Sequence, residues 1–154
     1  MQKKYILIFL FLLLISNLFS QECFEYHQNH CFPKKSKFVY KENSSSVSFK
    51  FASGEMREIP FVFLLGKDYR ITLCADEVFD NIIKIVIVNE EGKEIYNNSL
   101  HDFNLNLEFS SRKTQNVTIE VFAPDPNIGI SDTVAFEGCI GVFIEEMISV
   151  KTGF

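Results

Sequence analysis

Apolar and polar residues alternate along most of the chain from Lys37 onward, which is the period of a β-strand with one buried face. The alternation predicts strands in the segments 47–51, 59–63, 69–74, 103–109 and 117–121. In the segment 103–109, Phe103, Leu105, Leu107 and Phe109 are expected to point inward. A final strand is expected in "CIGVFIEEMISV", from residue 139 to residue 150.

Two departures from simple alternation predict where strands lie in a sheet. The segment "NIIKIVIV" (81–88) is apolar on both faces except at Lys84, which predicts a central strand. Pro60 interrupts "REIPFVFLL", so that strand is expected at a sheet edge, or with its first residues outside the ladder. Turn residues such as "ENSSS", "EEGK" and "SSRK" separate the strands. The pattern predicts an all-β fold, an antiparallel β-sandwich or jelly roll of about eight strands, spanning residues 37–154.

The N-terminal pattern is different and predicts export. Lys3 and Lys4 precede an unbroken apolar run at 5–15, and Ser20 is a small residue suited to cleavage. A membrane-spanning helix needs about 20 apolar residues, so residues 1–20 are predicted to be a cleaved signal peptide. No second run of this kind follows, so no membrane span is expected in the mature chain. The expected location is the periplasm, the cell surface or the extracellular space.

Residues 21–36 are expected to form a short helical or looped strap before the sandwich. Glu22 stands directly before Cys23, where an acylated lipoprotein cysteine would need a small residue, so an ordinary secreted cysteine is favoured. Composition then narrows the partners. The net charge is −5 at pH 7, which argues against binding to nucleic acid or anionic membranes. Seventeen phenylalanines and no tryptophan suit a sheet core.

The stretch "CFEYHQNHC" begins at Cys23 and ends at Cys31, and Cys74 and Cys139 complete an even set of four cysteines. In an oxidising compartment an even set predicts disulfides, and the favoured pairing is Cys23–Cys31 with Cys74–Cys139. A straight helix would separate the first two Cα atoms by about 12 Å, so their pairing requires the chain to turn back. If the stretch is helical, each of these cysteines must instead pair with Cys74 or Cys139.

The same stretch also suggests a metal site as an alternative. Cys23, His27, His30 and Cys31 supply the sulfur and nitrogen ligands that tetrahedral zinc takes. The two histidines lie between the cysteines, however, which is a poor match to the paired spacings of zinc sites. A disulfide is therefore the favoured interpretation, with no metal or other cofactor expected.

Catalytic motifs are weak in this sequence. Ser99, His101 and Asp102 lie in "SLHD", but a catalytic triad is assembled from distant segments, so a polar hairpin loop is predicted there. The acid pairs Asp76-Glu77 and Glu145-Glu146 point to opposite faces of a strand and form no dyad by themselves. No nucleophile elbow, zincin, P-loop or dinucleotide motif occurs.

Two further patterns concern calcium binding and glycosylation. "DPNIGISD" offers oxygen ligands for calcium at Asp125, Asn127 and Asp132, although without the dense acidic spacing of a known calcium loop. Three asparagines stand in acceptor sequons, which matter only where the source glycosylates asparagine: Asn43, Asn97 and Asn116.

The segments "GKDYRITLCADEV", "GKEIYNNS" and "GCIGVFIEEM" together resemble a family of small exported β-sandwich proteins of Bacteroidota. More loosely, the chain is similar to bacterial pre-peptidase C-terminal (PPC-like) domains, which are non-catalytic β-sandwiches attached to secreted enzymes. Neither resemblance supplies catalytic residues. The prediction is an exported, non-enzymatic binding or accessory module for an unknown protein or glycan partner. The alternatives are a metal-binding protein that uses the 23–31 segment and, third, an enzyme of unrecognised type.

Overall fold

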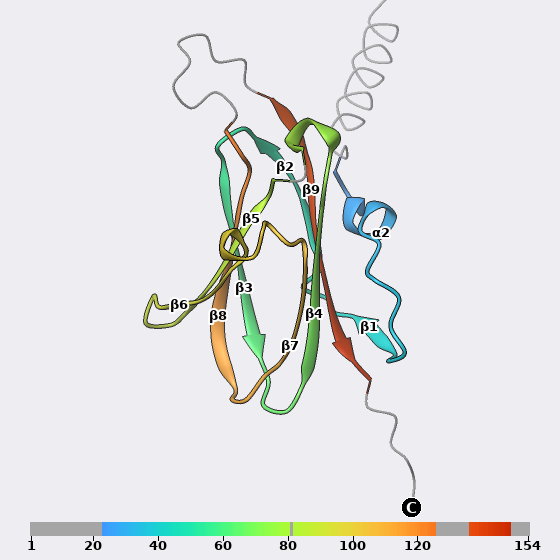
Figure 1. The fold of residues 1–154 in the computed structure, drawn as a ribbon, viewed down its shortest axis with the longest axis vertical. Coiled ribbons are helices and arrows are strands. Elements are labelled where there is room, and N and C mark those ends of the chain that lie inside the picture. Colours follow the sequence, from blue (N-terminus) through green and yellow to red (C-terminus); the bar gives the residue numbers. More distant parts are fainter. Residues whose placement is uncertain (1–22, 81, 126–135, 149–154) are drawn as a thin grey trace, which may run out of the picture.

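A computed structural model describes residues 23–80, 82–125 and 136–148, and it shows two antiparallel sheets packed face to face (Figure 1). The first sheet contains β1 Tyr40–Glu42, β2 Val47–Ala52, β4 Asp68–Ala75, β7 Asn106–Ser110 and β9 Glu137–Met147. The second contains β3 Met56–Phe63, β5 Lys84–Asn89, β6 Glu94–Asn97 and β8 Gln115–Phe122. The short helices are α2 Tyr26–His30, η1 Glu77–Phe79 and η2 Asn98–Leu100. Among the described residues, no helix is long and apolar enough to cross a membrane.

The order of strands leaves β7 and β6 at sheet edges. In the first sheet β9 pairs with β4 on one side, and β7 pairs with the far side of β4. On the other side of β9, β2 pairs with residues 137–142 and β1 pairs with residues 145–147. In the second sheet the order is β3-β8-β5-β6. The predicted all-β sandwich is therefore confirmed. The edge position of the Pro60 strand (β3) and the interior position of β5 are confirmed as well.

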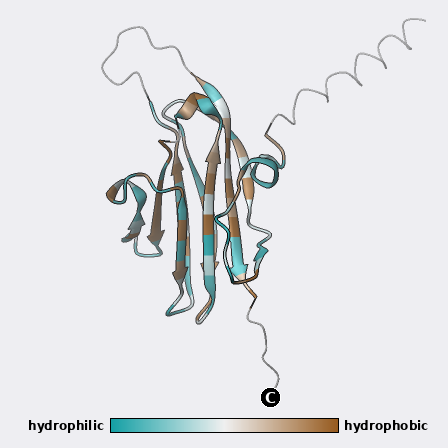
Figure 2. Cartoon of the chain, turned by 45° about the vertical axis from the view of Figure 1, so that its right-hand side comes forward, coloured by the Kyte–Doolittle hydropathy of each residue, from teal (hydrophilic) through white to brown (hydrophobic). Residues whose placement is uncertain are grey.

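The core lies between the sheets and follows the predicted alternation. Most inward side chains of the two sheets are almost fully buried, whereas Leu107 and Phe109 of β7 are partly buried against the core. Figure 2 shows hydrophobic colouring along the strands. An aromatic cluster fills one part of the core, with ring centroids 4.6–5.8 Å apart, and consists of Phe61, Phe63, Tyr69 and Phe109. Edge-to-face contacts dominate this cluster, the geometry that aromatic quadrupoles favour.

The predicted inward position of Phe103 is wrong. Phe103 is 36% exposed with φ 52°, in a turn that precedes β7. The fully buried Asn98 determines this turn, because its carbonyl accepts the Phe103 N–H at 3.0 Å and its Nδ2 donates to the Asn104 carbonyl at 3.4 Å. The loop closes around the Asn98 amide, so the strand starts only at Asn106.

The predicted disulfide pairing is also wrong. The structure joins Cys23 to Cys139 and Cys31 to Cys74, with Cα–Cα distances of 5.4 and 5.0 Å. The reason is that the stretch between the two strap cysteines contains a helix. Residues 26–30 form α2, so the two strap cysteines are too far apart to pair and reach two adjacent strands instead.

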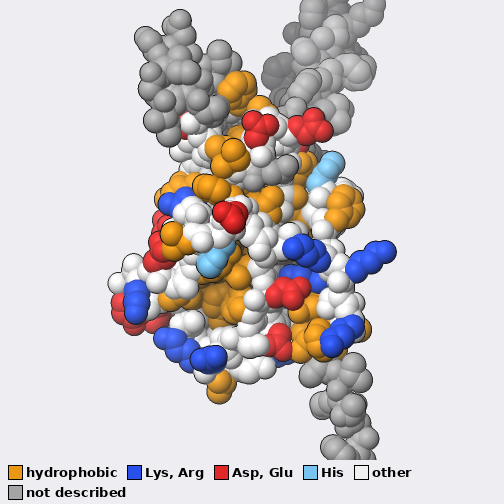
Figure 3. Space-filling model, viewed as in Figure 1, with side chains coloured by type: hydrophobic (Ala, Val, Ile, Leu, Met, Phe, Trp, Pro, Cys, Tyr) orange, Lys and Arg blue, Asp and Glu red, His pale blue; other side chains and the backbone are white. Residues whose placement is uncertain are grey.

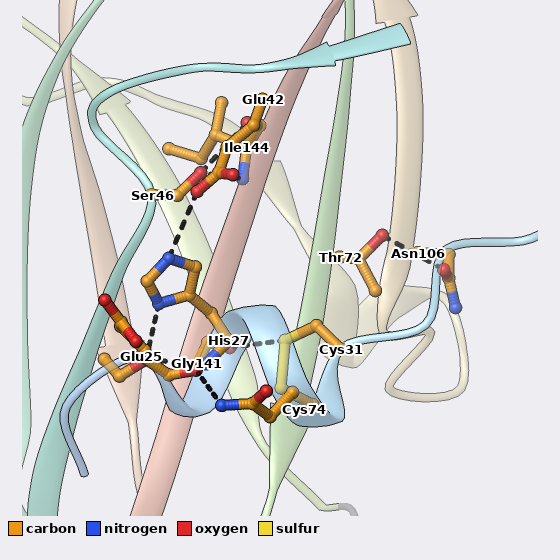
Figure 4. The surroundings of a disulfide bond; sticks show 12 residues. Glu25, His27, Cys31, Glu42, Ser46, Thr72, Cys74, Asn106, Gly141 and Ile144 are labelled. Carbon is orange, nitrogen blue, oxygen red and sulfur yellow. Dashed lines mark hydrogen bonds and ion pairs between the residues drawn. A yellow bond between two sulfur atoms is a disulfide. The ribbon is translucent and has the colours of Figure 1, made fainter.

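The strap covers the outer face of the first sheet, as Figure 1 shows for α2 beside β9 and β4. This cover explains why Arg70, Thr72 and Cys74 are buried although they point away from the core. Gly141 makes the close approach possible, because a Cβ there would lie 2.8 Å from both Cys74 Sγ and His27 Cα. Figure 4 shows Cys31 reaching from the end of α2 to Cys74 on β4.

Candidate binding groove

An apolar groove of about 410 Å³ opens between β6 and β7, where the two sheets separate. Figure 3 shows it as a hydrophobic hollow below η2, with Lys and Arg side chains beneath it. It is lined by Phe63, Ile87, Ile95, Tyr96, Leu107, Phe109, Ser110, Ser111, Arg112, Lys113 and Gln115. These residues come from five strands and the β7–β8 turn, so the groove exists only in the folded sandwich.

The groove stays open because β6 is too short to close it. Strand β6 has four residues, and its register with β5 shifts between Ile87 and Val88. Ile95 lies opposite that shift and remains 43% exposed. Across the gap Leu107 and Phe109 pack against the core while staying half-buried. Apolar side chains on both walls therefore remain accessible at the mouth.

The rim of the groove is basic. Arg112 and Lys113 line it, and neither has an ion-pair partner among the described residues. In a chain with net charge −5, two adjacent unpaired cations favour an acidic group in a ligand. Gln115 Oε1 is buried at the groove and lacks a hydrogen-bond partner within the described part of the chain. A buried acceptor of this kind is costly to leave unpaired, and a ligand N–H or O–H would satisfy it.

The lining of the groove contains no Asp, Glu, His or Cys, and its titratable side chains are Tyr96, Arg112 and Lys113. The two serine hydroxyls are engaged, Ser110 with Asp68 Oδ1 and Ser111 with the Lys113 carbonyl. Burial raises the pKa of the Tyr96 phenol above its ordinary value of 10, so this group stays protonated.

Two other depressions differ in character. On the opposite side of the sandwich a cavity of about 490 Å³ is lined by Pro60 and Val62 together with polar and acidic groups such as Asn116, Glu90 and Glu146. Asn116 donates a hydrogen bond to Glu90 Oε1 there. Beside the strap, a wide depression of about 760 Å³ includes Tyr26, His30 and Asp76.

The Tyr26 phenol in the strap depression is held protonated. Burial raises the pKa of Tyr26 first, and the hydrogen bond to Asp76 raises it further. His30 stacks on the Tyr26 ring at 4.1 Å. A protonated phenol is a hydrogen-bond donor and not a base, so Tyr26 is not an activated nucleophile.

The structure contradicts the alternative of a zinc site in the 23–31 segment. Both strap sulfurs belong to disulfides, so no thiolate ligand remains in the 23–31 segment. His27 of α2 is buried against the sheet, where Ser48 Oγ accepts its backbone N–H at 2.8 Å and lies 2.7 Å from its Nδ1. The Nε2 atom lies 3.3 Å from Glu42 Oε1 (Figure 4). His27 thus joins the strap to β1 and β2, and the described residues contain no cluster suited to a metal ion.

The remaining predicted residues are not brought together into a site. The "SLHD" segment is not the predicted hairpin loop, because it forms η2 and a turn that join β6 to β7 in the other sheet. The Ser99 hydroxyl donates to Asn97 Oδ1 at 2.7 Å, and the His101 ring stacks on Tyr96. Glu145 is buried and pairs with Arg70 at 2.7 Å. Of the three oxygen ligands proposed for calcium only Asp125 falls within the described residues, and the other two lie outside them, at positions 127 and 132.

Comparisons with known proteins add a distant structural similarity. No protein-family model matches the chain, and no curated protein matches it. Among solved structures the chain is similar to PliG of Aeromonas hydrophila, described as a periplasmic lysozyme inhibitor of g-type lysozyme. The identity is 8%, the match covers 73% of this chain and 92% of that chain, and the TM-score is 0.45. A similarity this weak supports no conclusion about the ligand of this chain.

The groove itself was missed by sequence reasoning. Leu107 and Phe109 were assigned to the inward face, and Arg112 and Lys113 to a turn, but nothing linked them to Ile95. The sequence feature that could have indicated the groove is the short segment "EIYN", which lies between the turn residues "EEGK" and "SLHD" and predicts a short strand there.

Proposed function

We propose that this protein is an exported, non-catalytic binding module whose ligand occupies the groove between β6 and β7. The observation that carries the proposal is the groove's combination of accessible apolar walls, a basic rim and an unpaired buried acceptor. Its volume of about 410 Å³ falls within the range of ligand sites, which is about 300–1,000 Å³. The ligand is therefore expected to be apolar or aromatic and to carry an acidic group.

Export is supported by the two disulfides, since such bonds persist in oxidising compartments. The predicted signal peptide lies outside the described residues, and it belongs to this proposal. Membership of the small exported β-sandwich proteins of Bacteroidota also remains a proposal based on the resembling segments. The groove favours a protein-like partner over a glycan, because its walls are apolar where a sugar would need hydrogen-bonding groups.

The proposal can be tested by NMR titration of the oxidised protein with indole-3-propionate, an aromatic carboxylate. A matched probe is tryptamine, which has the same ring and an amine of opposite charge. The carboxylate is expected to shift the amide signals of β6, β7 and the 110–113 turn. A fragment of this size is expected to bind with a dissociation constant on the order of 1 mM. Tryptamine is expected to bind more weakly.

Two variants separate the groove from the rest of the surface. Ile95→Glu places an acid in the mouth and is expected to abolish the shifts, whereas Val62→Glu changes an exposed residue of the opposite cavity and is expected to leave them intact. Shifts that map outside β6 and β7, or that survive Ile95→Glu, would show that the groove is not the binding site. Equal binding of both probes would refute the acidic preference.

A further inference from the structure

The free edge of β7 presents backbone groups to the groove, and this inference rests on the proposed function of that groove. The Leu73 N–H donates to the Leu105 carbonyl, and the Ser111 N–H donates to the Lys67 carbonyl, each at 2.8 Å. Because backbone groups alternate direction along a strand, the odd-numbered residues of β7 face β4. The N–H and C=O groups of Glu108 and Ser110 therefore point away from β4, where no other described strand pairs with them.

The other outer strands are less suited to accept a new strand. Edge strands are commonly protected by proline, by bulges or by being short. Pro60 interrupts the edge at β3, the register shift opposite Ile95 interrupts the four-residue β6, and β1 has only three residues. Strand β2 also has a continuous edge, but none of its residues lines the groove. Strand β7 has none of these devices, since its five residues pair with β4 in continuous register and contain no proline.

We propose that the partner is an extended polypeptide segment that adds as a strand to the free edge of β7. Neighbouring strands lie about 4.8 Å apart, so an added strand would run along the mouth of the groove. Alternate side chains of the partner would then enter the apolar groove toward Ile95 and Tyr96. An acidic side chain near one end of the segment would meet Arg112 and Lys113, which follow β7 directly. This arrangement uses the backbone edge, the apolar walls and the basic rim together.

A second copy of this chain fits the same edge poorly. Two-fold antiparallel pairing about the middle of the outward-facing groups would set Glu108 opposite the same residue of the other copy. Like charges directly opposite each other destabilise a strand pair. Glu108 is exposed, and its nearest cation, Arg70, lies at 3.8 Å and already pairs with Glu145 at 2.7 Å. The partner is therefore a different polypeptide that brings the acidic group itself.

The test begins with a phage-displayed library of random decapeptides, selected against the oxidised protein and counter-selected against the Ile95→Glu variant. Enriched peptides are expected to alternate apolar residues with polar ones and to contain Asp or Glu. The best peptide is then synthesised with single N-methyl groups, each of which removes one backbone donor. A single N-methyl group at a residue whose N–H faces β7 is expected to weaken binding about tenfold. A single N-methyl group at the residues between, whose N–H groups face away from β7, is expected to have little effect.

Variants of the protein provide the matched control. Ser110→Pro removes the outward N–H of Ser110, and Ser110→Ala removes the same hydroxyl but keeps that N–H. Proline is expected to weaken peptide binding at least about tenfold, and alanine is expected to leave it unchanged. Amide hydrogen exchange is an independent measurement on the unmodified protein. Peptide binding should slow the exchange of the Glu108 and Ser110 amides specifically.

The possible outcomes separate this inference from the proposed function. If no peptide is enriched, or if N-methylation has no alternating effect, strand addition is refuted, while indole-3-propionate still decides whether the groove binds ligands. If the fragment also fails to bind, the proposed function fails as well. Peptides that bind Ser110→Pro and wild type equally would likewise overturn strand addition. Self-association of the chain in place of peptide binding would show that the partner is a second copy.

Discussion

The disulfides of the strap give the sharpest quantitative prediction. The Cys31–Cys74 bond spans 43 residues and the Cys23–Cys139 bond spans 116. Loop-closure entropy taken separately gives about 4 kcal/mol for the shorter loop and about 5 kcal/mol for the longer one. The shorter bond lies inside the longer loop and shortens it. Loop-closure entropy alone therefore predicts a cost of about 4 kcal/mol of unfolding free energy for removing the Cys31–Cys74 bond, and a cost between about 4 and 5 kcal/mol for removing the Cys23–Cys139 bond.

The variants are Cys31→Ala with Cys74→Ala, and Cys23→Ala with Cys139→Ala, so neither leaves an unpaired thiol. Urea unfolding followed by circular dichroism measures the free energy, after a non-reducing peptide map has verified the pairing in wild type. The strap helix has only five residues, and a helix of that length is not stable by itself. The loss is therefore expected to include strap contacts such as the His27 hydrogen bonds to Ser48.

A second observable distinguishes the mechanism. A cross-link restricts the unfolded chain, so its removal exposes more surface on unfolding and should increase the urea m-value. A loss below about 1 kcal/mol for both variants would refute the entropic reasoning. A peptide map that joins Cys23 to Cys31 would refute the described arrangement of the strap itself.

Three further predictions concern the packing under the strap and beside η2. Gly141→Ala is expected to cost about 1–3 kcal/mol in thermal unfolding, because its Cβ would lie 2.8 Å from the His27 backbone; an unchanged melting temperature would contradict the close approach. Glu145→Gln should cost about 3 kcal/mol, because the buried Arg70 would keep only the more distant, exposed Glu108 carboxylate; Arg70→Met combined with Glu145→Leu should be nearly neutral in the same assay. Asn98→Ala is expected to cost about 2–4 kcal/mol in urea unfolding, since buried backbone groups at 83 and 85 lose their partners; retention of wild-type stability would show that water replaces the amide.

The sequence was sufficient for the class of fold because a strand with one buried face has a local signature. The period of two identified β3, β4 and β8 with the correct faces, and Pro60 identified an edge because proline cannot donate to a ladder. It failed at Phe103, where the alternation continued but the chain was already folded around the Asn98 amide. That amide bonds to groups at 83 and 104, and no local pattern reveals such contacts.

Tertiary structure alone decided the disulfide pairing and the groove. Pairing depends on which strands become neighbours, and Cys74 meets the strap because β4 lies beside β9 in the sheet. The groove depends on the short, irregularly paired β6 lying across the core from β7, and the two strands belong to different sheets. Local sequence encodes the direction in which a side chain points. What that side chain meets is determined by segments far away along the chain, because burial and pairing are long-range properties of the packed sandwich.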